Sequence, residues 1–188
     1  MMKFSPRLAG CALAAGARRR QGCRQQGAEY ALIPSGSLQS VLSGGGSGNV
    51  PVPMAAFAMR TLPVSNGEFQ AFTDSHPEWQ RGRIPPIFAD ASYLHQMEGA
   101  RLPESDAKRP VTSVSWFAAQ AFCEAEGARL PSWYEWEYVA AADAGRADAR
   151  SDPAWRAAIL SWYSQSSNKP QPAVGGPANF YGVRNCTA

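Results

Sequence analysis

Short groups of apolar residues, separated by turn residues, predict β-structure between residues 30 and 59. The apolar groups lie at 30–33, 38–42 and 50–59. Pro34-Ser35-Gly36 divides the first two, and a loop rich in glycine and serine at 43–49 divides the last two. This loop lacks the Lys-Ser/Thr pair of a phosphate-binding loop, so we interpret it as a flexible hairpin tip.

From residue 65 onward the apolar spacing becomes helical, and each predicted helix follows a polar capping residue. The predicted N-caps are Ser65, Ser115, Ser132 and Asp152. Glu68 and Glu135 each lie three residues after a serine cap, which is the spacing of a capping box. Pro77 and Gly127 are expected to end the first two helices.

Tryptophans occur at core spacing in these helices. We expect five of them to be buried: Trp116, Trp133, Trp136, Trp155 and Trp162. Trp79 lies in a long proline-rich segment over residues 76–110, and is the one tryptophan expected to be exposed as a platform for a sugar. Such a segment is usually functional or held by its own side chains.

The stretch GARLPSWYEWEYVAA, residues 127–141, contains two glutamates among aromatic residues. Glu135 caps a helix, where the positive helix end is expected to lower its pKa. Glu137 falls on the same face as Trp136 and is expected to be buried, with Arg129 as its nearest partner. A general acid/base pair is the alternative interpretation.

The cysteines show no metal-ligand spacing, and neither His76 nor His95 lies near one in sequence. The four cysteines are Cys11, Cys23, Cys123 and Cys186. Cys123 lies beside Phe122 on an apolar helix face, so we expect it to be a small buried hydrophobic residue rather than a nucleophile.

The chain has 188 residues, a length that suits one domain, and its net charge is +3. Arg18, Arg19, Arg20 and Arg24 all precede Glu29, and the remainder of the chain is close to neutral. The basic pI therefore does not indicate nucleic-acid binding. The sequence contains no apolar run of about 18 residues, which is the length that a membrane-spanning helix needs.

Residues 1–28 resemble an export signal or a disordered basic leader. Lys3 and Arg7 precede a short apolar run at 8–14, followed by the small residues Ala15-Gly16-Ala17. LAGC at Cys11 and QGC at Cys23 also resemble lipoprotein boxes. The expected location is therefore exported, either periplasmic or lipid-anchored.

The sequence RPVTSVSWFAAQAFCEAEGARLPSWYEWEYVAAAD, residues 109–143, resembles the signature of the formylglycine-generating enzyme family, also called sulfatase-modifying factors. MRTLPVSNGEFQAF resembles the first helix of that family, and PANFYGVRN resembles a later turn. We expect a family-like domain at 29–184 and a tail outside the family at 185–188. The signature residues are Ser115, Trp116, Cys123, Arg129, Pro131, Ser132, Glu135, Trp136, Glu137, Asn179 and Gly182.

The resemblance implies an α+β fold of variant C-type-lectin-like type, with little regular secondary structure. Active members of the family hold copper(I) with a pair of cysteines, bind calcium, and oxidise a cysteine of an unfolded sulfatase to formylglycine. Other branches use non-haem iron for sulfur transfer to histidine derivatives, or only bind.

The family motifs that follow Gly182 are missing, namely the calcium-binding Gly-Asn-x-Trp-Glu-Trp, Arg-Gly-Gly-Ser, the cysteine pair and Gly-Phe-Arg. Cys186 is a single thiol, so the chain is expected to contain no catalytic, cofactor or metal residue. We interpret it as truncated by a frameshift or early stop, inactive in formylglycine formation, and prone to expose apolar patches. The alternative is a non-catalytic lectin-like binding or accessory protein for maturation of an exported enzyme, for example in denitrification.

Overall fold

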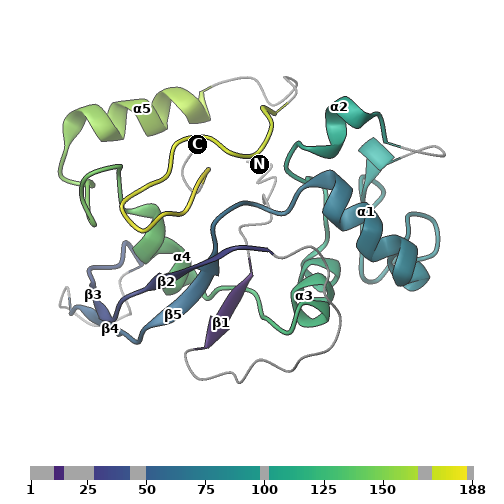
Figure 1. Cartoon of the computed structure of the whole chain (residues 1–188), viewed down its shortest axis with the longest axis horizontal. Helices are drawn as coiled ribbons and strands as arrows, with labels where there is room; N and C mark the ends of the chain where they lie inside the picture. Colours follow the sequence, from purple (N-terminus) through teal and green to yellow (C-terminus); the bar gives the residue numbers. More distant parts are fainter. Residues whose placement is uncertain (1–10, 15–27, 43–49, 98–101, 165–170, 186–188) are drawn as a thin grey trace.

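A three-stranded antiparallel sheet runs through the middle of the molecule (Figure 1). The computed structural model describes residues 11–14, 28–42, 50–97, 102–164 and 171–185. The strands lie in the order β1 (Ala12–Ala14), β5 (Phe57–Arg60) and β2 (Tyr30–Ile33). Strand β5 is central, since it pairs with both neighbours.

A second, two-stranded sheet consists of β3 (Gly36–Leu38) and β4 (Val52–Met54). The β-structure predicted for this part of the chain is therefore confirmed, with different boundaries. The strand predicted at 38–42 is wrong beyond Leu38, because β3 covers Gly36–Leu38 and begins inside the predicted turn. The predicted run at 50–59 divides into β4 and β5. The predicted hairpin tip at 43–49 lies outside the described residues.

The helices begin where the capping residues predict. They are α1 (Asn66–Ser75), α3 (Trp116–Ala125), α4 (Trp133–Ala140) and α5 (Pro153–Tyr163). Ser65 and Ser132 each accept a hydrogen bond from the backbone N–H of the glutamate three residues later, and both capping boxes are complete. Ser115 caps α3, and the Asp152 carboxylate caps α5.

The long proline-rich segment is held by its own contacts and by three short helices: η1 (Pro77–Trp79), η2 (His95–Met97) and α2 (Glu104–Ala107). The Tyr93 hydroxyl donates to the Trp79 carbonyl at 2.7 Å, and Gln96 donates to the Thr112 carbonyl at 2.6 Å. Tyr93 and Leu94 are buried, so this segment contributes to the core.

The central sheet separates two hydrophobic cores. One core lies toward α1 and α3; its buried members include Cys11, Val64, Phe69, Phe72, Val111, Phe122 and Cys123. The other lies toward α4 and the last described segment; its members include Ala12, Ile33, Phe57, Met59, Val139 and Val183. Neighbouring residues of one strand contribute to opposite cores, as the two-residue period of a strand requires.

The predicted burial of the five tryptophans is wrong, because Trp136, Trp155 and Trp162 are only half-buried and the other two are exposed. Trp116 is 61% exposed and Trp133 is 47% exposed, while Trp79 is half-buried against the first core. Trp116 and Trp133 are the first residues of their helices. The Trp133 ring lies along α4, where its indole N–H donates to the Glu137 carboxylate one turn later.

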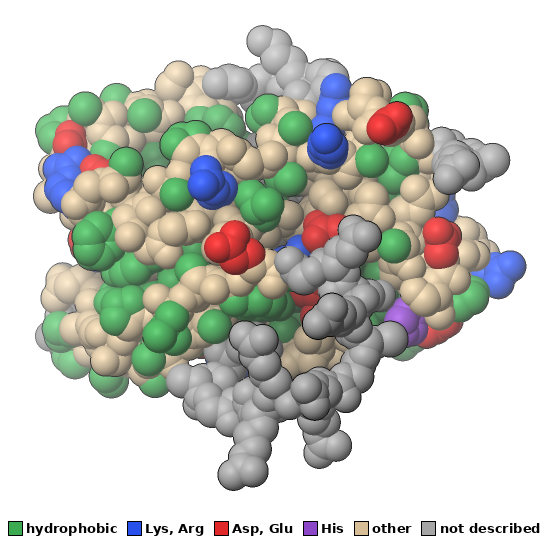
Figure 2. Space-filling model, viewed as in Figure 1, with side chains coloured by type: hydrophobic (Ala, Val, Ile, Leu, Met, Phe, Trp, Pro, Cys, Tyr) green, Lys and Arg blue, Asp and Glu red, His purple; other side chains and the backbone are tan. Residues whose placement is uncertain are grey.

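Large apolar side chains are exposed at several places. Those more than half exposed include Leu32, Val41, Leu42, Val50, Ile87, Leu160, Tyr163 and Phe180. Figure 2 shows one face of the molecule, on which Lys and Arg side chains are scattered with apolar side chains between them. Within the part of the chain that the structure describes, no helix has the length and apolarity to cross a membrane.

Part of the predicted leader lies inside the fold. Residues 1–10 and 15–27 are outside the described residues, and so is the predicted cleavage site. Cys11 and Ala12 are fully buried, and Ala12–Ala14 form β1 beside β5. Residue 29 was the predicted start of the domain, and Cys11 and Ala12 contribute to the cores from positions before it.

Candidate functional site: the signature helix and its polar contacts

Helix α4 positions the two signature glutamates, and its first turn holds Glu135. Arg129 donates from both terminal nitrogens to the Glu135 carboxylate, at 2.7 and 2.6 Å. The Ser132 backbone N–H donates to the same carboxylate at 2.8 Å. The pKa of Glu135 is lowered, mainly by the hydrogen bond from Arg129, which confirms the predicted direction.

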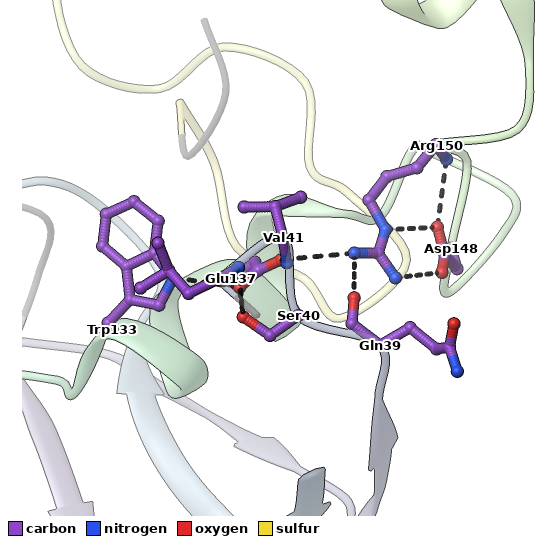
Figure 3. A network of polar contacts seen from close by, with 8 residues as sticks. Gln39, Ser40, Val41, Trp133, Glu137, Asp148 and Arg150 are labelled. Carbon is purple, nitrogen blue, oxygen red and sulfur yellow. Dashed lines mark hydrogen bonds and ion pairs between the residues drawn. The ribbon is translucent and has the colours of Figure 1, made fainter. Parts of the chain in front are cut away.

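Glu137 is 5% exposed and accepts from four donors (Figure 3). The Ser40 hydroxyl donates at 2.6 Å and the Val41 backbone N–H at 2.7 Å. The Trp133 indole N–H donates at 3.0 Å, and Arg150 lies 3.3 Å away. The carboxylate thus joins α4 to the segment that follows β3.

The predicted partner of Glu137 is wrong, because Arg129 binds Glu135 and Arg150 binds Glu137. Residues two positions apart on a helix differ by about 200° in direction. Glu135 and Glu137 therefore point to opposite sides of α4, and Arg129 can reach only one of them. Burial of Glu137 itself is confirmed.

Arg150 connects this carboxylate to a further segment. Its guanidinium pairs with Asp148 at 2.7 Å and donates to the Gln39 carbonyl at 2.5 Å. The pKa of Asp148 is lowered, first by the hydrogen bond from Arg150. Three segments distant in sequence thus meet around Glu137, and each of its oxygens already accepts hydrogen bonds.

Sequence reasoning missed a second charge cluster, which surrounds the buried side chain of Arg60. Arg60 is 3% exposed and pairs with Glu68 and with Glu126, the latter at 2.7 Å. The Tyr30 hydroxyl donates to Glu126 at 3.1 Å, and burial raises the pKa of Tyr30. Its members lie on β5, β2, α1 and the end of α3, so no local spacing signals it.

Cys123 is fully buried, as predicted, and forms a disulfide with Cys11. The sequence does not signal this pairing, because the two residues are separated by 112 positions. Cys23 and Cys186 lie outside the described residues.

The donors of the described residues do not fit the copper site that the family resemblance implies. Copper(I) prefers thiolates, and the sulfur of Cys123 is engaged in the disulfide. Across the described ranges, no group of three or more His, Cys, Asp and Glu side chains could hold a metal ion. Nδ1 of His76 and of His95 each contacts a backbone carbonyl, that of Phe72 and Ser92 respectively.

The later signature residues form a turn against α4. The Asn179 side chain donates to the Val139 carbonyl at 2.9 Å and accepts from the backbone N–H groups of Tyr181 and Val183. Gly182 has φ of 82°, a conformation that favours glycine. Asn179 thereby ties the last described segment to the end of α4. Tyr181 packs on Tyr138 of α4, with 5.5 Å between the ring centroids.

Two open cavities adjoin signature residues. One, of about 350 Å³, lies between residues 52–57 and the side of α4 that carries Arg129 and Glu135. The other, of about 360 Å³, lies between residues 86–90 and the start of α3, at Ser115, Trp116 and Phe117. Both are open depressions of the surface.

A profile of the sulfatase-modifying factor enzyme 1-like domain matches residues 17–187. The chain belongs to this family. The match includes α4, the turn at Asn179 and all the other signature residues. The mixed helix and sheet architecture is consistent with such a domain.

Curated relatives in this family are named hercynine oxygenase. The protein of Mycobacterium tuberculosis is 32% identical over 116 residues, which cover 54% of this chain and 27% of the relative. That of Mycolicibacterium smegmatis is 28% identical over 144 residues, covering 68% and 33%. That of Mycolicibacterium thermoresistibile is 30% identical over 147 residues, covering 68% and 32%. The chain therefore spans about a third or less of their length.

Proposed function

We propose that this chain is a scaffold and binding part of a sulfatase-modifying-factor-type protein, built on the variant C-type-lectin-like fold. By itself it does not oxidise a protein cysteine to formylglycine. One observation carries the proposal: the signature side chains capable of acid/base or thiol chemistry are already engaged inside the fold.

The engaged groups are two carboxylates and one thiol. The lone pairs of Glu135 face Arg129 and a backbone N–H, and those of Glu137 face four donors. A general base needs a free acceptor in reach of the proton that it removes. Cys123 is in a disulfide, and only a thiolate is a nucleophile or a copper ligand.

Relatives named hercynine oxygenase support oxygen-dependent chemistry on a histidine derivative as the activity of a longer protein of this type. In the full-length family, copper and calcium are held by segments beyond the motifs found here. Because the described donors do not fit such a site, we derive no reaction step through a metal.

Two incubations of the purified chain test the proposal. In the first, a Cys-x-Pro-x-Arg peptide, copper(I) and oxygen are supplied, and mass spectrometry measures the aldehyde. In the second, hercynine, a thiol and iron(II) are supplied, and an electrode measures oxygen consumption. We expect both to match a protein-free control. Turnover above that control in either incubation would show that the chain is catalytic.

A second candidate is an accessory role in the maturation of an exported enzyme, such as one of denitrification. A cluster of exposed aromatic side chains beside the 360 Å³ cavity supports a protein partner. The ring centroids of Phe88 and Phe117 lie 4.9 Å apart, and those of Phe117 and Trp116 lie 5.4 Å apart. The disulfide supports an oxidising compartment. Fractionation of cells that express the full chain tests this, since recovery in the cytoplasm with reduced cysteines contradicts it.

A further inference from the structure

Strand β1 is short and has neighbours on both edges. Ala12 pairs with Met59 of β5 on one side. On the other side its N–H donates to the Arg129 carbonyl at 2.7 Å, and its carbonyl accepts from the Arg129 N–H at 3.0 Å. A strand of three residues contributes few ladder hydrogen bonds, so another restraint is needed to hold it.

The disulfide between Cys11 and Cys123 provides this restraint. It joins the residue immediately before β1 to helix α3, across 112 positions of sequence. Both cysteines and Ala12 are fully buried, and the Cys11 carbonyl accepts from the Arg60 N–H at 3.0 Å. A cross-link that closes so long a loop removes much conformational entropy from the unfolded chain.

This strand lies outside the region that the family profile matches. The match begins at residue 17, after Cys11 and β1, whereas Cys123 lies inside it. The disulfide therefore joins a segment outside the matched region to a cysteine of the family signature.

We propose that β1 is a redox-controlled latch. With the disulfide formed, β1 covers one edge of β5 and pairs with Arg129; reduction releases it. A dithiol reductant breaks the Sγ–Sγ bond, delivers two electrons and two protons to give two thiols, and itself becomes a cyclic disulfide. Oxidation by a disulfide-donating partner reverses the reaction.

Release of β1 changes the surroundings of the signature helix. It uncovers the N–H and carbonyl groups of β5 that pair with β1, and it frees the backbone of Arg129. The Arg129 side chain binds Glu135 and lines the 350 Å³ cavity, so the latch acts on this cavity through Arg129. Lipidation of Cys11 consumes the same sulfur, so a lipid anchor and the latch exclude one another.

Hydrogen–deuterium exchange of the full chain, with and without a dithiol reductant, tests the latch. We expect reduction to speed exchange about tenfold at the amides of Arg60 and Arg129, which donate to Cys11 and Ala12, because local opening of these hydrogen bonds sets the rate. Amides of Phe69 and Phe72 in α1 are expected to keep their protection, which shows that the domain stays folded.

Two variants separate the latch from general effects of reduction. Cys11→Ser is expected to exchange fast at Arg60 and Arg129 without reductant, and to be unaffected by it. Cys186→Ser, the matched control, is expected to retain the response of the unsubstituted chain. Unchanged exchange on reduction overturns the proposal, as does peptide mapping that links Cys11 to a different cysteine. Equal loss of protection in α1 also overturns it, because the bond is then a staple of the whole fold.

Discussion

Helices α4 and α5 look alike in sequence and differ in the structure. Both follow a polar N-cap, both contain two tryptophans, and both show apolar residues at helical spacing. Helix α4 buries Glu135, Glu137, Val139 and Ala140, whereas none of the residues of α5 is buried. Figure 1 shows α5 on the outside of the molecule and α4 behind the sheet.

The difference lies in what each helix contacts. Side chains from β3, β4 and the last described segment pack against α4, and its polar groups bind Ser40, Asn179 and Arg150. Helix α5 is held at its start by Asp152, which caps it and pairs with Arg146 at 2.7 Å. Leu160 and Tyr163 of α5 are 68% and 59% exposed. Apolar spacing thus predicts a helix face, but burial requires a surface that faces it.

The largest expected difference between the helices comes from the buried carboxylate of α4. Glu137→Ala leaves Arg150 and three other donors without their acceptor, so we expect a loss of about 3 kcal/mol in the free energy of unfolding. Urea unfolding measures this loss. Arg156→Ala on α5 is the control, with an expected change within about 0.5 kcal/mol. Similar losses in the two variants would remove the distinction between the helices.

Core packing gives the next effect. Val139 of α4 is fully buried, and Val139→Ala is expected to lower the free energy of unfolding by about 2 kcal/mol, through lost burial and a cavity. Leu160→Ala on α5 removes a larger side chain and is expected to cost about 0.5 kcal/mol or less. Thermal unfolding of both variants tests this. A larger cost for Leu160→Ala would mean that α5 is covered in solution.

Removal of an N-cap is expected to have a smaller effect on stability, which is global for α4 and local for α5. Ser132→Ala removes the cap of α4 and is expected to cost about 1 kcal/mol in global unfolding. Asp152→Ala is expected to leave global unfolding unchanged and to speed hydrogen exchange at Ala154 and Trp155, because α5 frays locally. If Asp152→Ala lowers global stability as much as Ser132→Ala, then α5 unfolds together with the core.

The smallest effect is a dependence on pH. The pKa of Glu135 in the folded chain is below its ordinary value of 4.5, so its ionised form stabilises the fold above that value. This contribution is lost as pH falls below about 4.5 toward the folded pKa. The stability gap between the unsubstituted chain and Glu135→Gln is therefore expected to narrow in acid, as measured by urea midpoints from pH 7 downward. A gap that stays constant for Glu135→Gln would contradict the assignment.

Local features could be predicted well from the sequence, and long-range partners could not. The four caps follow from residue type and spacing, because a serine or aspartate side chain binds an N–H two or three positions later. The partner of Glu137 is Arg150, which depends on how the chain returns past α4 after residue 140. No spacing rule describes that return.

Two further features were beyond local reasoning for the same reason. The Arg60 cluster joins residues from four elements, and the Cys11 disulfide joins the N-terminal part of the chain to α3. Burial of the tryptophans also depends on tertiary contacts, because helical spacing does not determine which face of a helix is covered.

The sequence by itself determined where α1, α3, α4 and α5 begin, that β-strands occur between residues 30 and 60, and to which family the chain is similar. These depend on interactions among residues a few positions apart and on motifs of fixed spacing. The tertiary structure alone decided which helix is buried, which arginine binds which glutamate, and that Cys123 pairs with Cys11. Such contacts join residues far apart in the chain, and only the path of the folded backbone brings them within bonding distance.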